Sequence, residues 1–334
     1  MTIRENIEQL ERNNLSVYAM HSADSKGRLK DEEQCDIRPV FQRDRDRILH
    51  SKSFRRLKDK TQVFLTPEGD HYRTRLTHTL EVSQNARTIA KALRLNEDLV
   101  EAIALGHDLG HTPFGHAGER ALNAVCPFGF EHAKQSVRTV DILEKNGQGL
   151  NLTFEVRDGM LNHQTKGMPT TLEGKIVRYS DKIAYIHHDM DDAIRAGILK
   201  ESDVPKDICD VIGYSTGERL DHFIHDIVTT SYDKPDIMMS EAVSQAMTDL
   251  RKFMFDHVYT NPEAKSEESK AEMLIQTLYN YYRHHLELLP EDLRMLIDQG
   301  EPDEKVVCDY ISAMTDRFAT AKYEEIYIPK SWHG

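Results

Sequence analysis

The sequence predicts an all-α protein, and two observations carry that prediction. In segments such as 75–93 and 172–194, apolar residues recur at intervals of three and four, which places them along one face of a helix. Alternating apolar and polar runs, which are typical of strands, are few. With 334 residues, the chain is long enough to bury a substantial core in one large domain or two.

Composition and charge narrow the function classes. The formal net charge of -13 argues against non-specific binding to duplex nucleic acid as the main role. No apolar run approaches the ~20 residues that span a bilayer, and the first residues lack the apolar core of a signal peptide. The four cysteines form no Cys-X-X-Cys pair, which is typical of a reduced cytoplasmic protein. They are Cys35, Cys126, Cys209 and Cys308. We therefore expect a cytoplasmic protein with no membrane partner.

The N-terminal segment 1–60 ends in a basic stretch. Residues 38–60 hold nine cationic side chains and three acidic ones. For the alternating charges of 43–47, ion pairs on a solvated helix face are the favoured explanation. A basic cluster in an acidic chain would also suit a bound polyphosphate, because arginine can chelate two phosphate oxygens at once. A strand-like run at 61–65 and a turn at 66–70 follow.

The predicted helix 75–93 carries Arg75, His78 and Glu81 at intervals of three, so these side chains share one face. His78 alone could equally be a packed histidine or a metal ligand. After a predicted helix that begins near Asn96, residues 105–119 contain three histidines, an aspartate, a glutamate, four glycines and a proline. This segment therefore concentrates residues that can bind a metal or transfer a proton.

Adjacent His107 and Asp108 offer a neutral nitrogen and an anionic oxygen, a donor set that suits a first-row divalent ion. The glycines and Pro113 bend the backbone, so that the remaining polar residues could face one cavity. These residues are His111, His116 and Glu119. In the next predicted helix, His132 is either another site residue or an ordinary buried histidine, and its sequence context alone favours the latter.

The predicted helix 172–194 places Asp181, Tyr185 and Asp189 at intervals of four, on one side of the helix. Apolar residues flank Asp181. Because an unpaired buried carboxylate is costly, Asp181 must be paired or must bind a metal, which makes it a candidate fourth ligand. The segment 147–171 is expected to be loop-rich, with a short helix near 155–161.

Beyond residue 200, further helices are predicted at 205–230, 237–259, 266–289, 291–298 and 303–322. We expect three regions: an N-terminal segment at 1–60, a core at 61–200 and a helical C-terminal region at 201–334. The last two are expected to form one continuous globular unit.

Four motifs together resemble the dGTPase-like family of HD-domain deoxynucleoside triphosphate (dNTP) triphosphohydrolases. They are SFRRLKDKTQVF (53–64), RTRLTH (73–78), HDLGHTPFGHAGE (107–119) and DYISAMTD (309–316). The resemblance implies an HD-domain helical, metal-dependent phosphohydrolase core with additional C-terminal helices. It implies a divalent metal ion, of manganese, magnesium, iron, cobalt, nickel or zinc, held by His78, His107, Asp108 and Asp181.

The resemblance also implies roles for the remaining candidates. His116, oriented by Glu119, would transfer a proton at the α-phosphate, although a nucleophilic His116 is left open. The implied substrate-binding residues are Arg75 and Lys182 for phosphate, Tyr185 and Asp189 for the deoxyribose, Gln62 near the sugar and base, and also His111, His132 and Arg55. The implied reaction releases a deoxynucleoside and inorganic triphosphate from dGTP and other dNTPs.

Two other functions are left open. One is another HD-domain nucleotidase or phosphodiesterase, which would not need Arg75, Lys182 and the Arg55–Arg56 region. The other is a regulator that senses dNTPs or single-stranded nucleic acid without catalysis. The family resemblance further implies a homo-oligomer, and an allosteric dNTP is left open, as are the preferred base and the number of subunits.

Overall fold

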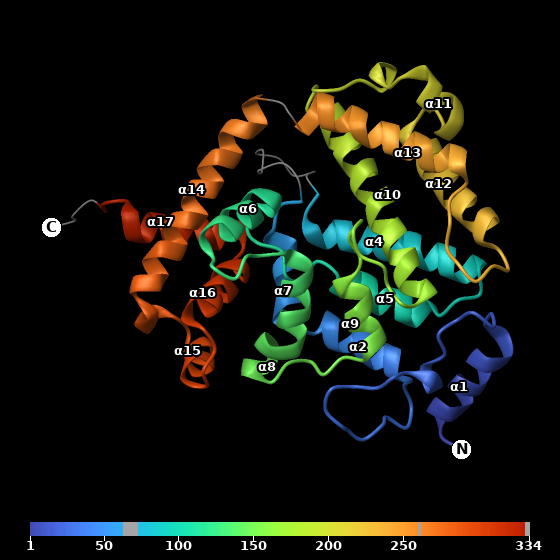
Figure 1. Cartoon of the computed structure of the whole chain (residues 1–334), viewed down its shortest axis with the longest axis horizontal. Coiled ribbons are helices and arrows are strands. Elements are labelled where there is room, and N and C mark those ends of the chain that lie inside the picture. Colours follow the sequence, from blue (N-terminus) through green and yellow to red (C-terminus); the bar gives the residue numbers. More distant parts are fainter. Residues whose placement is uncertain (63–72, 260–261, 331–334) are drawn as a thin grey trace. The chain divides into compact units, whose positions relative to one another are not determined.

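This computed structural model describes residues 1–62, 73–259 and 262–330. Over these ranges the chain forms helices and two isolated bridges, Arg28–Thr153 and Thr61–Thr74, without a strand. The all-α prediction is therefore confirmed (Figure 1). Residues 63–65 of the strand predicted at 61–65 lie outside the described residues, and so does the whole turn predicted at 66–70.

The chain divides into two compact units, each built from three segments that are distant in sequence. Unit 1 comprises residues 1–50, 77–107 and 151–262, and unit 2 comprises 51–76, 108–150 and 263–334. The three consecutive regions predicted from the sequence follow a different scheme, and their boundaries stay a prediction.

Unit 1 is organised around a buried central helix, α5 (Glu97–Gly106). Asn96 caps the start of this helix, because its side chain accepts a hydrogen bond from the Leu99 amide. Its apolar residues are buried on all sides, and it packs against α2 (Val40–Leu49), α9 (Phe154–Leu161) and α10 (Leu172–Arg195). The other helices of this unit are α1 (Ile3–Asn14), most of α4 (Arg75–Ala92), α11 (Lys206–Ile212), α12 (Thr216–Ser231) and α13 (Glu241–Met254).

Two glycines let α5 and α9 approach closely. A Cβ atom built at Gly159 of α9 would lie 2.5 Å from the Cδ1 atom of Ile103, and one at Gly106 of α5 would lie 2.7 Å from the Sδ atom of Met160. Both distances are shorter than van der Waals contact, so the two backbones can come this near only because these positions lack side chains. The close approach brings the C-terminal ends of α5 and α9 together.

Unit 2 has its own hydrophobic core, to which Leu122, Ile275, Leu278, Val307 and Ile311 contribute. These residues come from α6 (Gly115–Val125), α14 (Pro262–His284) and α16 (Asp303–Ser312). The unit also contains α3 (Lys52–Arg56), α7 (His132–Arg138), α8 (Glu144–Gly147), α15 (Glu291–Asp298) and α17 (Asp316–Tyr327).

Two predicted helices are broken in the structure. The helix predicted at 205–230 is divided at Gly213, whose φ of 105° is left-handed, a conformation that glycine adopts without strain. The helix predicted at 303–322 ends at Ser312, and a new helix begins after Thr315, whose hydroxyl accepts a hydrogen bond from the Phe318 amide. Apolar spacing alone predicted continuous helices because it continues through both breaks.

The arginines of 43–47 are paired with carboxylates of other segments. Arg43 and Arg47 contact Glu32 at 3.2 and 2.6 Å, and Arg45 contacts Asp98 at 3.2 Å. The prediction of ion pairs is confirmed. Arg45 also contacts its neighbour Asp46 on the same helix at 3.0 Å, whereas the other partners lie in different segments. Asp44 is fully buried and bonded to Arg28, so the solvated position expected for it is wrong.

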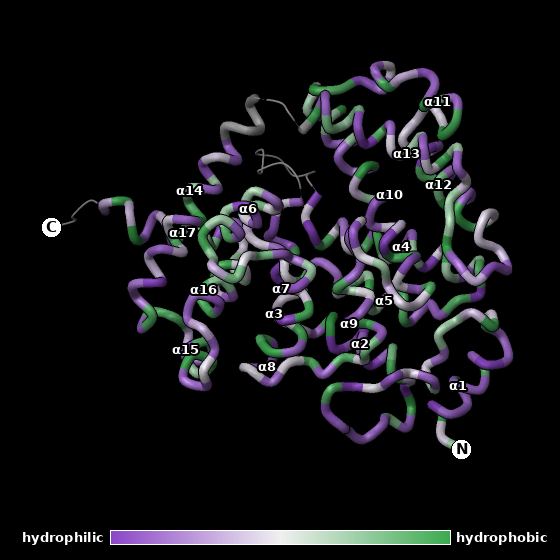
Figure 2. Tube along the Cα trace, viewed as in Figure 1, coloured by the Kyte–Doolittle hydropathy of each residue, from purple (hydrophilic) through white to green (hydrophobic). Residues whose placement is uncertain are grey.

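Hydrophobic and hydrophilic residues alternate along the helices instead of separating into long uniform segments (Figure 2). Among the described helices, none combines the length and the apolar character that crossing a membrane requires.

One buried carboxylate of unit 1 makes a testable prediction about pH. Glu173 on α10 accepts hydrogen bonds from the Met20 and Asn96 amides, at 2.9 and 3.1 Å, and is fully buried. Burial raises its pKa from 4.5 to about 7. Between these two pH values the unfolded chain has released this proton while the folded chain retains it, so the Glu173 contribution to stability falls as the pH rises.

We expect Glu173→Gln to flatten this part of the stability–pH curve, an effect on the order of 3 kcal/mol across the window. The glutamine oxygen can still accept both amide hydrogen bonds. Chemical denaturation at pH 5 and pH 7 measures the difference. An equal slope in the variant and the natural chain would contradict the assignment, and Glu218→Gln on α12 serves as a surface control.

Candidate functional site

His107 lies directly after the last residue of α5. Its Nδ1 atom is 2.6 Å from the Ala104 carbonyl oxygen, and because a carbonyl can only accept, Nδ1 must carry the proton. The other ring nitrogen, Nε2, then has a lone pair, which is the form of histidine that binds a metal. That Nε2 atom is 3.8 Å from Oδ1 of Asp181 on α10.

A relay of side chains fixes the tautomer of His78 on α4 in a similar way. His188 Nε2 contacts the carboxylate of Glu81, and His188 Nδ1 is 3.3 Å from His78 Nδ1. If His188 donates to Glu81, its Nδ1 atom accepts, and His78 Nδ1 must then donate to it. His78 Nε2 is left as an acceptor 3.2 Å from Asp181 Oδ1.

In this tautomer two acceptors face each other, and a positive charge between them would stabilise the pair. Burial raises the pKa of Asp181, but the adjacent rings of His78 and His107 lower it to about 2, so these neighbours favour the anionic carboxylate. A separation near 3 Å also matches two neighbouring ligands of one ion, each about 2.1 Å from it. These residues of unit 1 could therefore hold a divalent metal, and the ligand roles of His78, His107 and Asp181 stay a prediction.

Asp108 follows His107 in the sequence and belongs to unit 2. Its Oδ2 atom accepts a hydrogen bond of 2.7 Å from Nη1 of Arg75, and its Oδ1 atom is 3.4 Å from His111 Nε2. Arg75 is only 1% exposed, and its Nη2 atom donates to the Gln62 carbonyl at 3.2 Å. A buried guanidinium held in this way is a strong local positive charge.

Three histidines gather beside this arginine. The rings of His111 and His132 stack at 3.8 Å between centroids, and His116 lies 5.6 Å from His111 and 6.2 Å from His132. Burial, followed by the charges of Arg75 and His132, lowers the pKa of His111 well below its usual value. His111 is thus neutral at pH 7. Its buried Nδ1 atom has no hydrogen bond with any described residue.

Glu119 contacts a different histidine from the one predicted. Its carboxylate lies 2.9 and 3.0 Å from Nδ1 of His132 and also accepts from the His132 amide at 2.8 Å. Glu119 acts on His116 through its charge. The sequence suggested His132 only through the family resemblance, whereas the structure gives it a carboxylate that orients its ring. The roles predicted for His116 and Glu119 stay a prediction.

His116 is exposed, so water reaches part of its ring. Desolvation of the remaining ring, then the charges of Arg75 and His132, lower the pKa of His116. The ring is therefore neutral at pH 7 in the free protein. In this form it can accept a proton or attack as a nucleophile, and it needs a proton before it can act as an acid.

The turn that presents His116 is held by residues from the C-terminal part of unit 2. Phe114, which precedes α6, has left-handed φ and ψ angles of 61° and 27°, a rare conformation for a residue with a side chain. Its amide donates at 2.9 Å to Oδ1 of Asp316, and Oδ2 of Asp316 accepts from the Thr61 amide at 2.9 Å. Asp316 therefore ties the start of α17 to both segments.

Lys60 supports the same turn from inside the unit. Its Nζ atom donates to the carbonyl oxygens of His111 and, at 2.7 Å, Ser312. Burial, then the nearby Arg56, lowers the pKa of Lys60 to about 7. This member of the basic stretch therefore bonds to backbone carbonyls. By contrast, Arg55 is exposed on α3.

We expect Asp316→Asn to lower hydrolysis on the order of 10²-fold, because a displaced turn misplaces His116. The amide cannot accept on both sides, so stability should fall by about 2 kcal/mol, while metal content stays unchanged. Turnover, thermal denaturation and elemental analysis check these three results. Asp298→Asn, an exposed carboxylate of the same unit, is the control, and full activity in Asp316→Asn would refute the positioning role.

The remaining candidates of unit 1 follow one another on α10. Lys182 and Tyr185 are half-buried, and Asp189 is buried. Burial, then Arg251 of α13, lowers the pKa of Lys182, whereas burial raises the pKa of Tyr185 to about 12 in spite of the same arginine. Arg251 therefore lies near both side chains, and the sequence had not suggested it. In unit 2, the Gln62 side-chain oxygen is buried and makes no hydrogen bond with a described residue.

The comparisons with known proteins agree with this chemistry. Residues 75–186 match the HD domain family, and residues 237–325 match the phosphohydrolase-associated domain. A deoxyguanosinetriphosphate triphosphohydrolase-like protein from Caldanaerobacter subterraneus subsp. tengcongensis is 55% identical over 333 residues, covering 99% of this chain and 98% of the relative. The chain belongs to the deoxyguanosinetriphosphate triphosphohydrolase-like family.

Other members of the dGTPase-like family are similarly related. One from Clostridium perfringens is 51% identical over 339 residues, covering 99% of both chains. The crystal structure of a phosphohydrolase from Bacteroides thetaiotaomicron shares the fold, with a TM-score of 0.53, 16% identity, and coverage of 84% of this chain and 69% of that one. The predicted family is thus confirmed, and this dGTPase-like protein is a phosphohydrolase.

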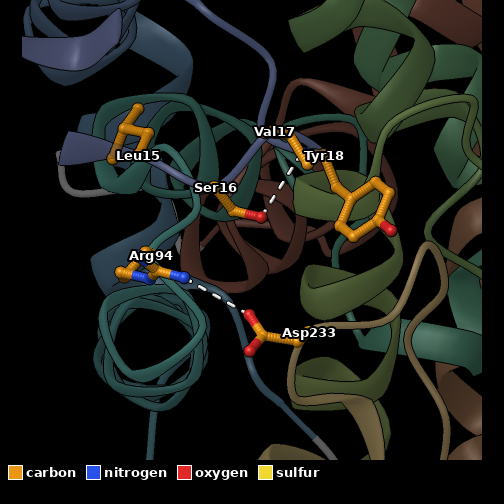
Figure 3. A pocket seen from close by; sticks show the side chains of 6 residues that line it. All are labelled: Leu15, Ser16, Val17, Tyr18, Arg94 and Asp233. Atoms are coloured by element: carbon orange, nitrogen blue, oxygen red, sulfur yellow. Dashed lines mark hydrogen bonds and ion pairs between the residues drawn. The ribbon is translucent and has the colours of Figure 1, made fainter. Parts of the chain in front are cut away.

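A separate pocket of unit 1, with a volume of about 280 Å³, carries none of these candidate residues (Figure 3). Its lining includes Val17, Tyr18 and the ion pair between Arg94 and Asp233, whose nitrogen and oxygen are 3.3 Å apart. Both charged side chains are exposed. The pocket therefore offers no buried reactive group, and the histidine clusters remain the candidate site of this dGTPase-like protein.

Proposed function

We propose that this dGTPase-like protein hydrolyses deoxynucleoside triphosphates to a deoxynucleoside and inorganic triphosphate by attack at the α-phosphorus. The observation that carries the proposal most is the 55% identity, over 99% of this chain and 98% of the relative, to a protein named deoxyguanosinetriphosphate triphosphohydrolase-like. The side chains of the candidate site support the proposal further, because they include groups suited to metal binding, phosphate binding and proton transfer.

A divalent ion would be held by His78, His107, Asp108 and Asp181. When bound, such an ion supplies Lewis acidity toward a phosphoryl oxygen. The Ala104 carbonyl would keep His107 in the ligand tautomer, and the His188 relay would do the same for His78. Several metals suit this mixed nitrogen and oxygen set, so its identity is left open.

The triphosphate would be bound by positive and hydrogen-bonding groups. Arg75 offers a buried positive charge, His111 and His132 offer ring nitrogens beside it, and Lys182 supplies a half-buried ammonium group. Because His132 Nδ1 is held by Glu119, its Nε2 atom is the one that would meet an oxygen. Positive groups around a transferring phosphoryl centre stabilise the charge that develops in the transition state.

His116 would transfer the proton at the scissile bond. Its ring is neutral in the free protein, and a bound triphosphate would raise its pKa because the negative charges favour the protonated form. A protonated His116 could then donate to the departing 5′ oxygen. A neutral His116 could act as the nucleophile instead, so the two roles make different predictions about the pH at which activity declines.

The sugar would be selected on α10 of unit 1. Tyr185 would lie beneath the deoxyribose and exclude a 2′-hydroxyl sterically, which is a way of rejecting ribonucleotides. Asp189 would accept a hydrogen bond from the 3′-hydroxyl, and Gln62 would contact the sugar and base. The exposed Arg55 would contribute a more distant positive charge.

The test is a panel of the four dNTPs and the matching ribonucleotides, alone and in pairs, with Mn²⁺ and with Mg²⁺. We expect dNTPs to yield deoxynucleoside and triphosphate, which ion-exchange chromatography separates from orthophosphate and pyrophosphate. Orthophosphate from nucleoside monophosphates, with dNTPs left intact, would favour the other phosphohydrolase class. Binding of dNTPs without any product would favour a sensor.

Two further outcomes of the same panel are informative. Ribonucleotide cleavage as fast as dNTP cleavage would contradict the Tyr185 role. Activity that appears only in nucleotide pairs would indicate an allosteric dNTP, and size-exclusion chromatography with and without dNTPs would test the expected homo-oligomer.

A further inference from the structure

His163 joins the metal-binding histidines of unit 1, although no sequence motif includes it. It lies just beyond the C-terminal end of α9 and is 2% exposed. Its ring centroid is 5.0 Å from that of His107 at an interplanar angle of 74°. Potential ligand atoms of His163, His107 and Asp181 all lie within 4.8 Å of one another.

The hydrogen bond that His163 makes repeats the one that prepares His107. Its Nδ1 atom is 2.7 Å from the Met160 carbonyl oxygen, three residues earlier, just as His107 Nδ1 is 2.6 Å from the Ala104 carbonyl. In both residues the carbonyl requires the proton on Nδ1, so Nε2 carries the lone pair. The C-terminal ends of α5 and α9 thus set the same tautomer in His107 and His163, and both histidines lie near Asp181.

The backbone packing of unit 1 is built to bring these two histidines together. Gly159 lies four residues before His163, and Gly106 lies directly before His107, and each leaves the space that the other helix occupies. A side chain at Gly159 would meet three atoms of Ile103 at 2.5–2.8 Å and would push α9 away from α5, and with it His163 from His107. This close approach is a second observation that points to the same site.

Charge gives a third reason. The Asp181 carboxylate lies in unit 1 beside three imidazole rings, those of His78, His107 and His163. Three neutral nitrogen donors around one carboxylate are a suitable ligand set for a first-row divalent ion.

We propose that His163 is a further ligand of the divalent metal held by His78, His107 and Asp181, binding through Nε2. The inference rests on the proposed metal site and adds a residue to it. It makes the metal affinity depend on the end of α9, outside the histidine–aspartate motif.

The experiment measures metal binding directly in the full-length protein. We expect His163→Ala to weaken Mn²⁺ and Co²⁺ binding about 10- to 100-fold or more, a range typical of residues that support a metal site. Titration against a competing chelator gives the Kd, and elemental analysis gives the stoichiometry. The Co²⁺ absorption spectrum should change, because one nitrogen ligand is lost, and added imidazole should partly restore it.

His225→Ala is the matched control, because His225 is an exposed histidine of the same unit. It should keep the Kd and the spectrum of the natural chain. A second variant, Gly159→Ala, keeps every candidate ligand but forces α9 away from α5, so a weaker Kd is expected there too. Circular dichroism verifies that each variant is folded.

The failures of the two proposals are distinguishable. If the natural chain binds neither Mn²⁺ nor Co²⁺, the proposed metal site itself is wrong. If it binds them and folded His163→Ala has the same Kd and the same Co²⁺ spectrum, only the role of His163 is refuted. A loss of thermal stability without a change in either reading would leave His163 as a residue that terminates α9.

Discussion

Asp181→Asn is expected to lower dGTP hydrolysis roughly 10³-fold or more and to release the bound divalent metal. The carboxylate is the anionic ligand that faces His78 at 3.2 Å and His107 at 3.8 Å, and the neutral amide cannot supply its charge. Loss of several kcal/mol of Lewis-acid stabilisation corresponds to such a factor, since each 1.36 kcal/mol is tenfold. Turnover, together with elemental analysis of the purified protein, checks both results.

The matched control for this prediction is Asp191→Asn. Asp191 lies on the same helix and contacts Arg195 at 3.1 Å, so its replacement tests the effect of removing a carboxylate from α10 without touching the histidines. Activity and metal content close to those of the natural chain are expected. If Asp181→Asn retains its metal and its turnover, the assignment of the metal site to this cluster fails.

His116→Ala is expected to lower kcat about 10²- to 10⁴-fold, the range for loss of a general acid or base, while metal content and KM change little. The reason is that His116, in the first turn of α6, is the proposed proton-transfer group and belongs to no proposed ligand set. His284→Ala, an exposed histidine of unit 2, should behave as the natural chain does.

The pH dependence distinguishes the two roles of His116. If it donates a proton as an acid, kcat should fall as the pH rises through the pKa of the substrate-bound histidine. If it attacks as a nucleophile, activity should fall as the pH drops and the ring becomes protonated, and a phosphorylated histidine should be trapped by rapid quenching. A pH profile in His116→Ala identical to that of the natural chain would exclude both roles.

Local sequence features predicted the helices well wherever an apolar stripe and a capping residue coincide. Asn96 marks the start of α5 because its side chain caps the Leu99 amide. The breaks at Gly213 and near Thr315 were not predicted, since the apolar spacing continues across them. Contacts between distant segments, such as Asp44 with Arg28, cannot be deduced from local periodicity, and so the burial of Asp44 was predicted wrongly.

The candidate site shows the same limit. The clustering of His78, His107 and Asp181 could be expected from the motif resemblance and from the cost of burying a carboxylate. The contact of Glu119 with His132 could not be predicted, because it joins two different helices, α6 and α7. His163 lies in a segment read as loop-rich, where a lone histidine carries no signal until α9 is packed against α5.

The hydrogen bond between Asp316 and the turn before His116 has a consequence for the translation of the chain. The two bonded residues, Phe114 and Asp316, are 202 positions apart in the chain. At roughly 5–20 residues per second, a ribosome needs on the order of 10–40 s to cover that distance. For most of this interval the nascent chain already contains His116 but lacks the carboxylate of Asp316, so the turn before His116 can reach its final form only late in translation.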